Sequence, residues 1–468
     1  MLVLGQGSYF VLGYLAVVFL ARELGPSSYG VYGVIMSVLV WLEQSGRHAI
    51  PSASAKLLAE TSHGQAELEK SALALNLGVH AVFFVLLWCA APWLESWFGI
   101  ANGTFLFRLA AVDLPLFGIY TALQATHQGG RRFFRLGIAQ VAYALAKLMG
   151  VLVIIHLGMS LQKALLVNIS ASIVGVVLLL AGTSLRSAGR WLVRAPLIVA
   201  IAIPLGLYSI AQLLIGSLDL WTLQTLSPAT EVASIGLFVA ALNIARVPAF
   251  ALATVSTVLL PSVSKAIALG DKPLVKHYMS QALRFFCLLY VPICLGLMAW
   301  PEELMQWVYS GKFAGGGVLL SILLVGEGLW GIHAVLGSAL IAANQARKMG
   351  LVMGVSIVPA LALNMLCIFL WGSVGAAVTK ILVPFVGILI FVRLLMQQYG
   401  VFWNGRSLFN IGLAGLLMFG SHALLSQDEG MFPFSLLIGI GMYVVTLVGT
   451  HELKPRDLTA FLSWQKAK

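Results

Sequence analysis

Residues 71–92 read SALALNLGVHAVFFVLLWCAAP, a run of 22 residues without a single Asp, Glu, Lys or Arg. A bilayer core about 30 Å thick requires about 20 mostly apolar residues for each helical crossing. This run is long enough for one crossing, and similar runs recur along the whole chain. The sequence therefore predicts a membrane protein built from transmembrane helices.

The composition agrees with this interpretation and leaves no room for a large water-soluble domain. Of the 468 residues, 60% are apolar and only 10% are charged, whereas soluble domains carry about 25% charged residues. We expect an all-α polytopic protein with about fourteen transmembrane helices joined by short polar connections. The predicted spans are residues 2–21, 29–46, 71–92, 104–126, 134–156, 161–182, 196–218, 231–258, 281–300, 317–342, 350–371, 374–397, 408–426 and 432–450.

The basic residues predict how the chain is oriented. The formal net charge is +11, but Lys and Arg lie mainly in the short connections, where they mark the cytoplasmic side. With a cytoplasmic N-terminus, the cytoplasmic segments hold 21 of the 28 bases and the opposite connections hold 3. We therefore expect both termini in the cytoplasm and no nucleic-acid partner. The first span lacks a basic flank, which leaves open a start further upstream.

Short fragments recur at similar spacings along the chain. Residues 50–54 (IPSAS) recur at 260–264 (LPSVS), residues 116–120 (LFGIY) at 329–333 (LWGIH), and residues 24–26 (LGP) more faintly at 226–228 (LSP). Any one match could arise by chance in so biased a composition. Their shared order favours two homologous six-helix lobes in a parallel pseudo-two-fold repeat.

This repeat predicts how the chain is organised. We expect an N-terminal six-helix lobe at residues 1–190 and a second at 191–400, around a central cavity. Two additional transmembrane helices follow at residues 401–450, and a cytoplasmic basic tail at 451–468.

Charged residues inside the spans are the candidate functional residues, because a charge at the centre of a membrane helix costs at least about 2.5–3.5 kcal/mol. Four bases lie there, and a cavity that they share would attract an anionic head group such as a pyrophosphate. Alternatively, each base reaches an interface or pairs with a carboxylate. Lys380 lies near the start of its span, and Lys163 competes for its role. The candidate substrate-binding bases are Arg108, Lys147, Arg246 and Lys380.

Two carboxylates, Asp113 and Glu327, lie comparably deep, whereas Glu43 lies nearer the end of a predicted span. Asp113 precedes Pro115, and Glu327 stands between two glycines, so each adjoins a point where a helix is easily bent. A carboxylate at this depth could bind a coupling H⁺ or Na⁺. A static ion pair with a neighbouring base is an equally good explanation.

The motifs of hydrolases, nucleotide-binding enzymes and metal sites are missing from the sequence. It contains no GxxxxGK[ST], GxSxG or HExxH motif and no zinc-type cysteine pattern. We therefore expect no enzyme activity, no catalytic residues, no metal and no cofactor apart from a coupling ion.

Several stretches resemble a known family. They are residues 21–26 (ARELGP), 29–32 (YGVY), 54–60 (SAKLLAE), 260–264 (LPSVS) and 372–377 (GSVGAA). These patterns resemble polysaccharide-transport and O-antigen flippases, within the superfamily of multidrug, oligosaccharidyl-lipid and polysaccharide exporters. The resemblance implies two lobes that alternate between inward-open and outward-open states, usually driven by an ion gradient.

The resemblance also implies a substrate and a location. Its flippase branch moves polyprenyl-pyrophosphate-linked oligosaccharides across the inner membrane of bacteria, among membrane lipids and beside neighbouring glycan-assembly proteins. A cation-coupled multidrug exporter is the alternative, but four internal bases disfavour an organic cation. A membrane glycan polymerase or ligase would need an external domain, and the external connections are shorter than about twenty residues.

Overall fold

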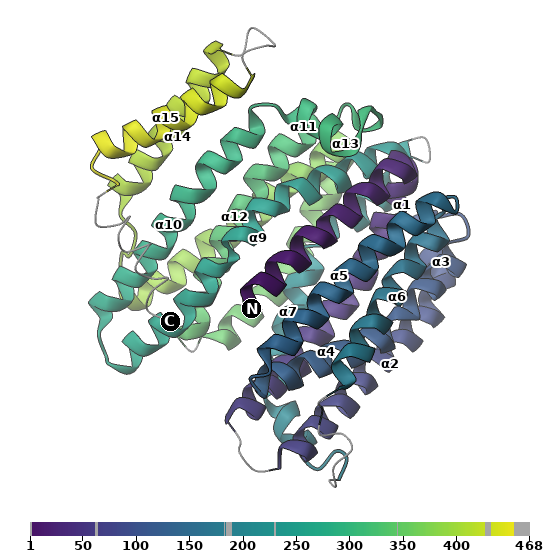
Figure 1. Ribbon diagram of the computed structural model, residues 1–468. Coiled ribbons are helices and arrows are strands. Elements are labelled where there is room, and N and C mark those ends of the chain that lie inside the picture. Colours follow the sequence, from purple (N-terminus) through teal and green to yellow (C-terminus); the bar gives the residue numbers. More distant parts are fainter. Residues whose placement is uncertain are drawn as a thin grey trace. The chain divides into compact units, whose positions relative to one another are not determined.

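The structure is a computed structural model that describes residues 2–60, 64–181, 183, 190–228, 231–343, 345–425 and 432–453. Every regular element within these ranges is a helix (Figure 1). The predicted basic tail lies, from residue 454 onwards, outside the described residues. The helices are α1 (Leu2–Glu60), α2 (Gln65–Phe98), α3 (Gly103–Ala111), α4 (Asp113–Gly129), α5 (Phe133–His156), α6 (Leu161–Leu180), α7 (Ala195–Ile215), α8 (Leu218–Leu226), α9 (Val232–Ala268), α10 (Lys272–Met298), α11 (Pro301–Tyr309), the 3₁₀ helix η3 (Gly311–Phe313), α12 (Gly317–Ala342), α13 (Ala346–Tyr399), α14 (Gly405–Leu425) and α15 (Phe432–Gly449).

Two of these helices are each a pair of membrane crossings. At 1.5 Å per residue, the 59 residues of α1 would extend about 90 Å as one rod, about three times the thickness of the bilayer core. The helix is instead interrupted at Gly25, where φ is 69°, and α13 is interrupted at Gly372, where φ is 54°. Positive φ values favour glycine, which has no Cβ. Each of these helices therefore consists of two arms, one on each side of a kink.

This division brings the described helices into agreement with the predicted fourteen spans. Ten helices are long and apolar enough to cross a bilayer, and the bent helix α7 makes eleven. Counting both arms of α1 and of α13 raises the number to thirteen. The shorter apolar helix α15 is the fourteenth. The prediction of an all-α polytopic fold is confirmed.

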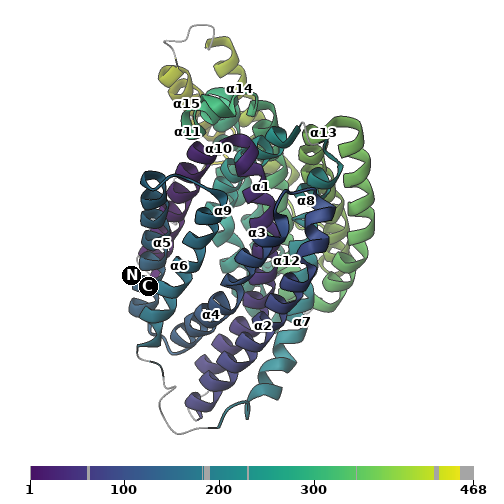
Figure 2. The same cartoon turned by 90° about the vertical axis from the view of Figure 1, so that its right-hand side faces the viewer.

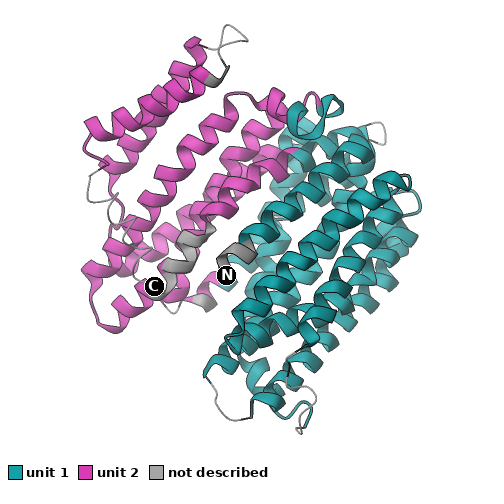
Figure 3. Ribbon diagram, in the orientation of Figure 1, with its two compact units in different colours: residues 1–240, 306–313, 350–376 teal, residues 241–305, 314–349, 377–468 magenta. Residues whose placement is uncertain are grey.

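The chain forms two compact units (Figure 3). In unit 1, α1 packs against α4, α5 and α7, and α2 lies beside α4 in both views (Figures 1 and 2). In unit 2, α10 packs against α12 and α14, and α14 pairs with α15. The lobe boundaries derived from the repeat stay a prediction, because the units group residues by contact and not by homology. Unit 1 contains residues 1–240, 306–313 and 350–376, and unit 2 contains residues 241–305, 314–349 and 377–468.

Large apolar side chains cover much of the outer surface. Phe369 is 83% exposed, Val355 73% and Leu416 71%. Such a surface would aggregate in water but is well solvated by lipid tails. The exposed side chains therefore place these helices in the bilayer.

The same local contact recurs after the third span of each predicted lobe. At the start of α3, the Glu95 carboxylate accepts a hydrogen bond from the Thr104 backbone N–H at 2.8 Å. At the start of α12, the Glu302 carboxylate accepts one from the Gly317 N–H at 2.9 Å. In both places a glycine packs on the backbone of the capping glutamate, Gly103 on Glu95 and Gly317 on Glu302. This recurrence supports the parallel internal repeat.

Candidate functional site

In unit 1, charged side chains from three helices meet in the core. Asp113 is the first residue of α4, next to a break at Val112 that separates this helix from α3. Lys147, on α5, interacts electrostatically with Asp113 and also with Glu43, on the second arm of α1. Asp113 is only 2% exposed and Glu43 only 6%. The structure thus brings two of the predicted residues together and adds a buried carboxylate to them.

In unit 2, a charged pair joins α9 to α12. The Nε atom of Arg246 lies 3.5 Å from Oε1 of Glu327. The Arg246 side chain remains 35% exposed, whereas that of Glu327 is 10% exposed. The pair therefore buries a carboxylate beneath a guanidinium that still reaches the surface of the unit.

Lys380, on the second arm of α13, lies in the same part of unit 2. It is 4% exposed, and its backbone passes close to Gly326, the residue before Glu327. A Cβ at Gly326 would lie 2.9 Å from the carbonyl oxygen of Lys380. Thus α12 contacts α13 at Gly326 and Lys380, and the next residue, Glu327, pairs with Arg246 of α9.

The glycines beside Glu327 serve close packing and do not open the helix. α12 runs without a break from Gly317 to Ala342. Gly328 packs on the ring of Tyr290, whose hydroxyl donates to the Leu324 carbonyl at 2.6 Å. Beside Asp113, by contrast, the single residue Val112 separates α3 from α4.

Arg108 lies apart from the other charged candidates in unit 1. Its guanidinium carbon is 5.2 Å from the centroid of the Trp88 ring, and its Nε donates to the Trp88 carbonyl at 3.4 Å. Trp88 is itself 39% exposed. This contact resembles a base that extends along an aromatic side chain towards an interface.

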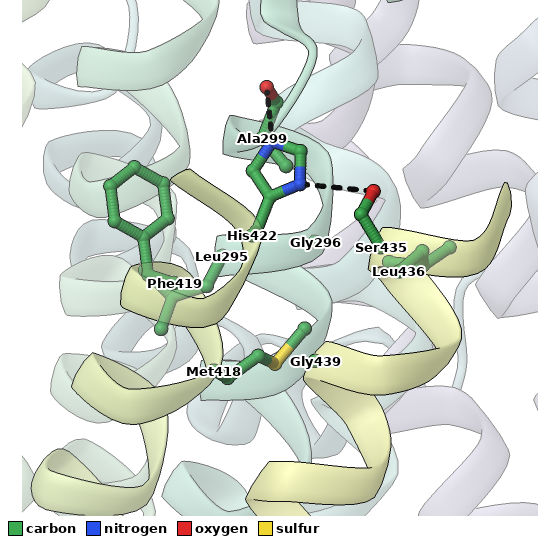
Figure 4. A pocket seen from close by; sticks show the side chains of 9 residues that line it. All are labelled: Leu295, Gly296, Ala299, Met418, Phe419, His422, Ser435, Leu436 and Gly439. Atoms are coloured by element: carbon green, nitrogen blue, oxygen red, sulfur yellow. Dashed lines mark hydrogen bonds between the residues drawn. The ribbon is translucent and has the colours of Figure 1, made fainter. Parts of the chain in front are cut away.

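A small, mostly apolar pocket that contains His422 and Ser435 lies in unit 2 between α14, α15 and the end of α10 (Figure 4). His422 Nε2 lies 3.2 Å from the Ala299 carbonyl oxygen, so this nitrogen carries the proton and donates it. Nδ1 then accepts from the Ser435 hydroxyl at 3.3 Å. The pocket holds about 10 Å³, which is the lower limit for a single water. The hydrogen bond from His422 to Ala299 attaches the terminal hairpin of α14 and α15 to the end of α10. The pocket itself is too small for a transported substrate.

The fold and the charged groups inside the spans define a multi-pass membrane protein of the transporter class. The model of one family, described as polysaccharide biosynthesis protein, matches residues 19–315. The chain belongs to this family.

A curated relative and two solved structures are similar to the chain. The probable low-salt glycan biosynthesis flippase Agl15 of Haloferax volcanii is 28% identical over 216 residues, and the match spans 44% of each chain. The lipid II flippase MurJ in an inward closed conformation has a TM-score of 0.78 at 14% identity, covering 96% of this chain and 99% of that chain. An inward-facing MATE family multidrug resistance transporter has a TM-score of 0.68 at 14% identity, covering 85% and 98%. At these identities the structural matches establish the fold.

Proposed function

We propose that this protein is a flippase for a polyprenyl-pyrophosphate-linked oligosaccharide. Its cargo would be a repeat unit of O-antigen, capsule or exopolysaccharide, moved by alternating access across the inner membrane of a bacterium and driven by an H⁺ or Na⁺ gradient. Both termini would lie in the cytoplasm, near the enzymes that assemble the glycan. The family and the glycan flippase among the relatives support this proposal.

The observation that carries the proposal is the Arg246–Glu327 pair. Glu327 engages Nε of the guanidinium, and the side chain remains 35% exposed. An arginine has five N–H donors in a planar fork, so one carboxylate at 3.5 Å leaves donors for a second anion. A pyrophosphate is such an anion, because its oxygens match the guanidinium fork. We assign Lys380 to the same head group, and Lys147 and Arg108 to secondary contacts with the anionic lipid-linked glycan.

Asp113 and Glu327 are the two candidate sites of ion coupling, and for each of them a static ion pair with the neighbouring base is the alternative. Both are buried within helices that cross the membrane. Each also has a base nearby, Lys147 for Asp113 and Arg246 for Glu327. An ion that binds either carboxylate would compete with the neighbouring base, and this competition can link ion binding to release of an anionic substrate.

Neutralising Arg246 tests the proposed binding site. In proteoliposomes that contain a lipid-linked oligosaccharide, we expect Arg246→Gln to weaken substrate binding about 10- to 100-fold, since a charge-assisted hydrogen bond contributes about 1.5–3 kcal/mol. Arg246→Lys should retain part of the activity. The measurement is the rate at which the glycan becomes accessible in the opposite leaflet under an imposed pH or Na⁺ gradient.

Two further variants keep this result interpretable. The double variant Arg246→Gln/Glu327→Gln removes both charges and leaves no unpaired buried carboxylate, so it should remain folded but inactive. Arg393, an exposed base of α13, serves as the matched control as Arg393→Gln. Wild-type flipping by both Arg246 variants would exclude this residue from the substrate site. Transport of a cationic dye without glycan movement would instead favour the multidrug-exporter alternative.

A further inference from the structure

Glu43 and Asp113 are two buried carboxylates, called the pair below, on helices α1 and α4, which pack together in unit 1. Glu43 lies on the second arm of α1 and Asp113 begins α4, and the two carboxylates repel each other electrostatically. The fully buried Ser172, on α6, lies beside Asp113. Among the described residues, neither the Ser172 hydroxyl nor Oδ1 of Asp113 makes a hydrogen bond of full geometry, although the two side chains interact. The pair thus has buried polar atoms available for a further proton or ligand.

The positive charges near Glu43 and Asp113 lie beyond ion-pair distance of the two carboxylates. Lys147 acts on both carboxylates, and Arg47 acts on Glu43. Within the described ranges, neither base forms an ion pair with Glu43 or Asp113. Two buried carboxylates that repel each other, with no base within ion-pair distance, are poorly suited to being ionised together. One bound proton removes their repulsion.

The other titratable side chains near Glu43 and Asp113 are three tyrosines and a histidine. Tyr143, on α5, interacts with both carboxylates and stacks on Tyr120 at 5.0 Å between ring centroids. The ring of Tyr9, which is partly exposed, lies 5.7 Å from that of Tyr143. His80, on α2, packs against Gly46 of α1, one turn from Glu43. The rings of Tyr143 and Tyr9 thus lie between the buried carboxylates and a partly exposed position of the unit.

The second half of the internal repeat holds a different charged pair. Counted from the fainter LGP and LSP fragments, Glu43 and Arg246 lie 17 and 18 residues after Pro26 and Pro228, whereas they lie 7 and 14 residues before the IPSAS and LPSVS fragments. Asp113 and Glu327 precede Gly118 and Gly331, the matching glycines of the repeat, by five and four residues. Where unit 1 places an acid opposite an acid, unit 2 therefore places a base opposite an acid. The carboxylate in unit 2 already has its counter-ion at 3.5 Å.

We propose that Glu43 and Asp113 together bind the coupling proton of this transporter, and that Glu327 belongs to a permanent ion pair. In the loaded state one carboxyl group carries the proton and the other remains ionised. On release the proton leaves to water, and Lys147 and Arg47 balance the two negative charges. The assignment of this proton to coupling rests on the proposed function, whereas its binding to the pair does not.

Infrared difference spectroscopy of the purified full-length protein tests this directly. Between acidic and alkaline buffer, the wild type should gain and lose the carbonyl band of a buried carboxylic acid. Glu43→Gln and Asp113→Asn should each abolish or shift this transition, while Glu327→Gln, the matched control, should leave it unchanged. Lys147→Met should move the transition to higher pH, because loss of a nearby positive charge favours the protonated pair.

The outcomes separate this inference from the proposed function. A wild-type band that Glu43→Gln and Asp113→Asn leave unaltered, or that Glu327→Gln removes, would overturn the proposal. A response to Na⁺ at constant pH, with none to pH, would replace the proton by sodium and also overturn it. If the band behaves as expected but no glycan moves in proteoliposomes, the proton site stands and the substrate assignment fails. In proteoliposomes, the rate of glycan flipping by Glu43→Gln should no longer depend on the pH gradient.

Discussion

Gly236→Ala is expected to lower the thermal stability of the protein markedly, because the new Cβ meets a backbone that cannot rotate away. A Cβ at Gly236 would lie 1.9 Å from the carbonyl oxygen of Pro26 and 2.5 Å from its carbonyl carbon. From the opposite side, a Cβ at Gly30 would lie 2.8 Å from the Gly236 nitrogen. The second arm of α1 and the first turns of α9 thus approach each other through glycines, a typical way for membrane helices to pack closely.

The expected cost is at or above the upper end of the usual range for overpacking, which is about 1–3 kcal/mol. Thermal unfolding of the purified protein, followed by loss of monodispersity, measures it. Gly420→Ala in α14 is the matched control, because no atom lies within 4 Å of its Cβ position. That variant should be neutral or slightly stabilising, since alanine favours a helix over glycine by up to about 1 kcal/mol. Equal melting temperatures for the two variants would show that the α1–α9 contact relaxes freely.

The number and position of the spans could be predicted because the bilayer imposes one requirement on every crossing. Each crossing must satisfy its own backbone hydrogen bonds over about 20 apolar residues. Hydropathy does not, however, mark where a helix ends once it leaves the apolar layer. The predicted second span ends at residue 46, but α1 continues to Glu60. Its last turns are held by Ile50, Ala53 and Leu57, which pack with residues of α2 and α7.

This extension explains why Glu43 was missed as a site residue. Judged by hydropathy, Glu43 lies three residues from the end of a span and has access to water. In the structure it lies in the interior of a longer helix and is only 6% exposed.

Depth alone also could not decide which way a charged side chain faces. Arg108 and Lys147 both lie inside predicted spans. One extends along Trp88, whereas the other interacts with two buried carboxylates. Only the rotation of each helix about its axis distinguishes them, and that rotation is set by packing against neighbouring helices.

Arg284→Met is expected to loosen the terminal hairpin of α14 and α15 from α10. Arg284 Nε lies 2.6 Å from Glu452 Oε1, and its Nη2 donates to the Glu452 backbone carbonyl. The Ser407 hydroxyl, at the start of α14, donates to the same carboxylate. The side chains of Arg284 and Glu452 are only 15% and 10% exposed. Removing the arginine leaves a buried carboxylate without its base, a change that costs about 3 kcal/mol or more.

A double variant separates the ion pair from the packing around it. Arg284→Met/Glu452→Met replaces both charges by apolar groups of similar length, which is often neutral or stabilising. We expect it to recover most of the melting temperature lost in Arg284→Met. The exposed residue Arg393 provides the control substitution Arg393→Met, which should have little effect. A double variant no more stable than Arg284→Met would show that packing of the arginine stem dominates.

The loss of stability in Arg284→Met should also depend on pH. Burial raises the pKa of Glu452, but hydrogen bonds from Ser407 and Arg284 and the charge of Arg284 outweigh it, so the pKa lies below its usual value. A lowered pKa stabilises the folded state above the unfolded pKa of about 4.3, and this stabilisation is lost as pH falls through the folded value. In the variant, protonation instead relieves an unpaired buried charge. The difference in melting temperature between the two proteins should therefore be largest near neutral pH and shrink in acid. A difference that stays constant with pH would assign the destabilisation to lost packing and not to the charge on Glu452.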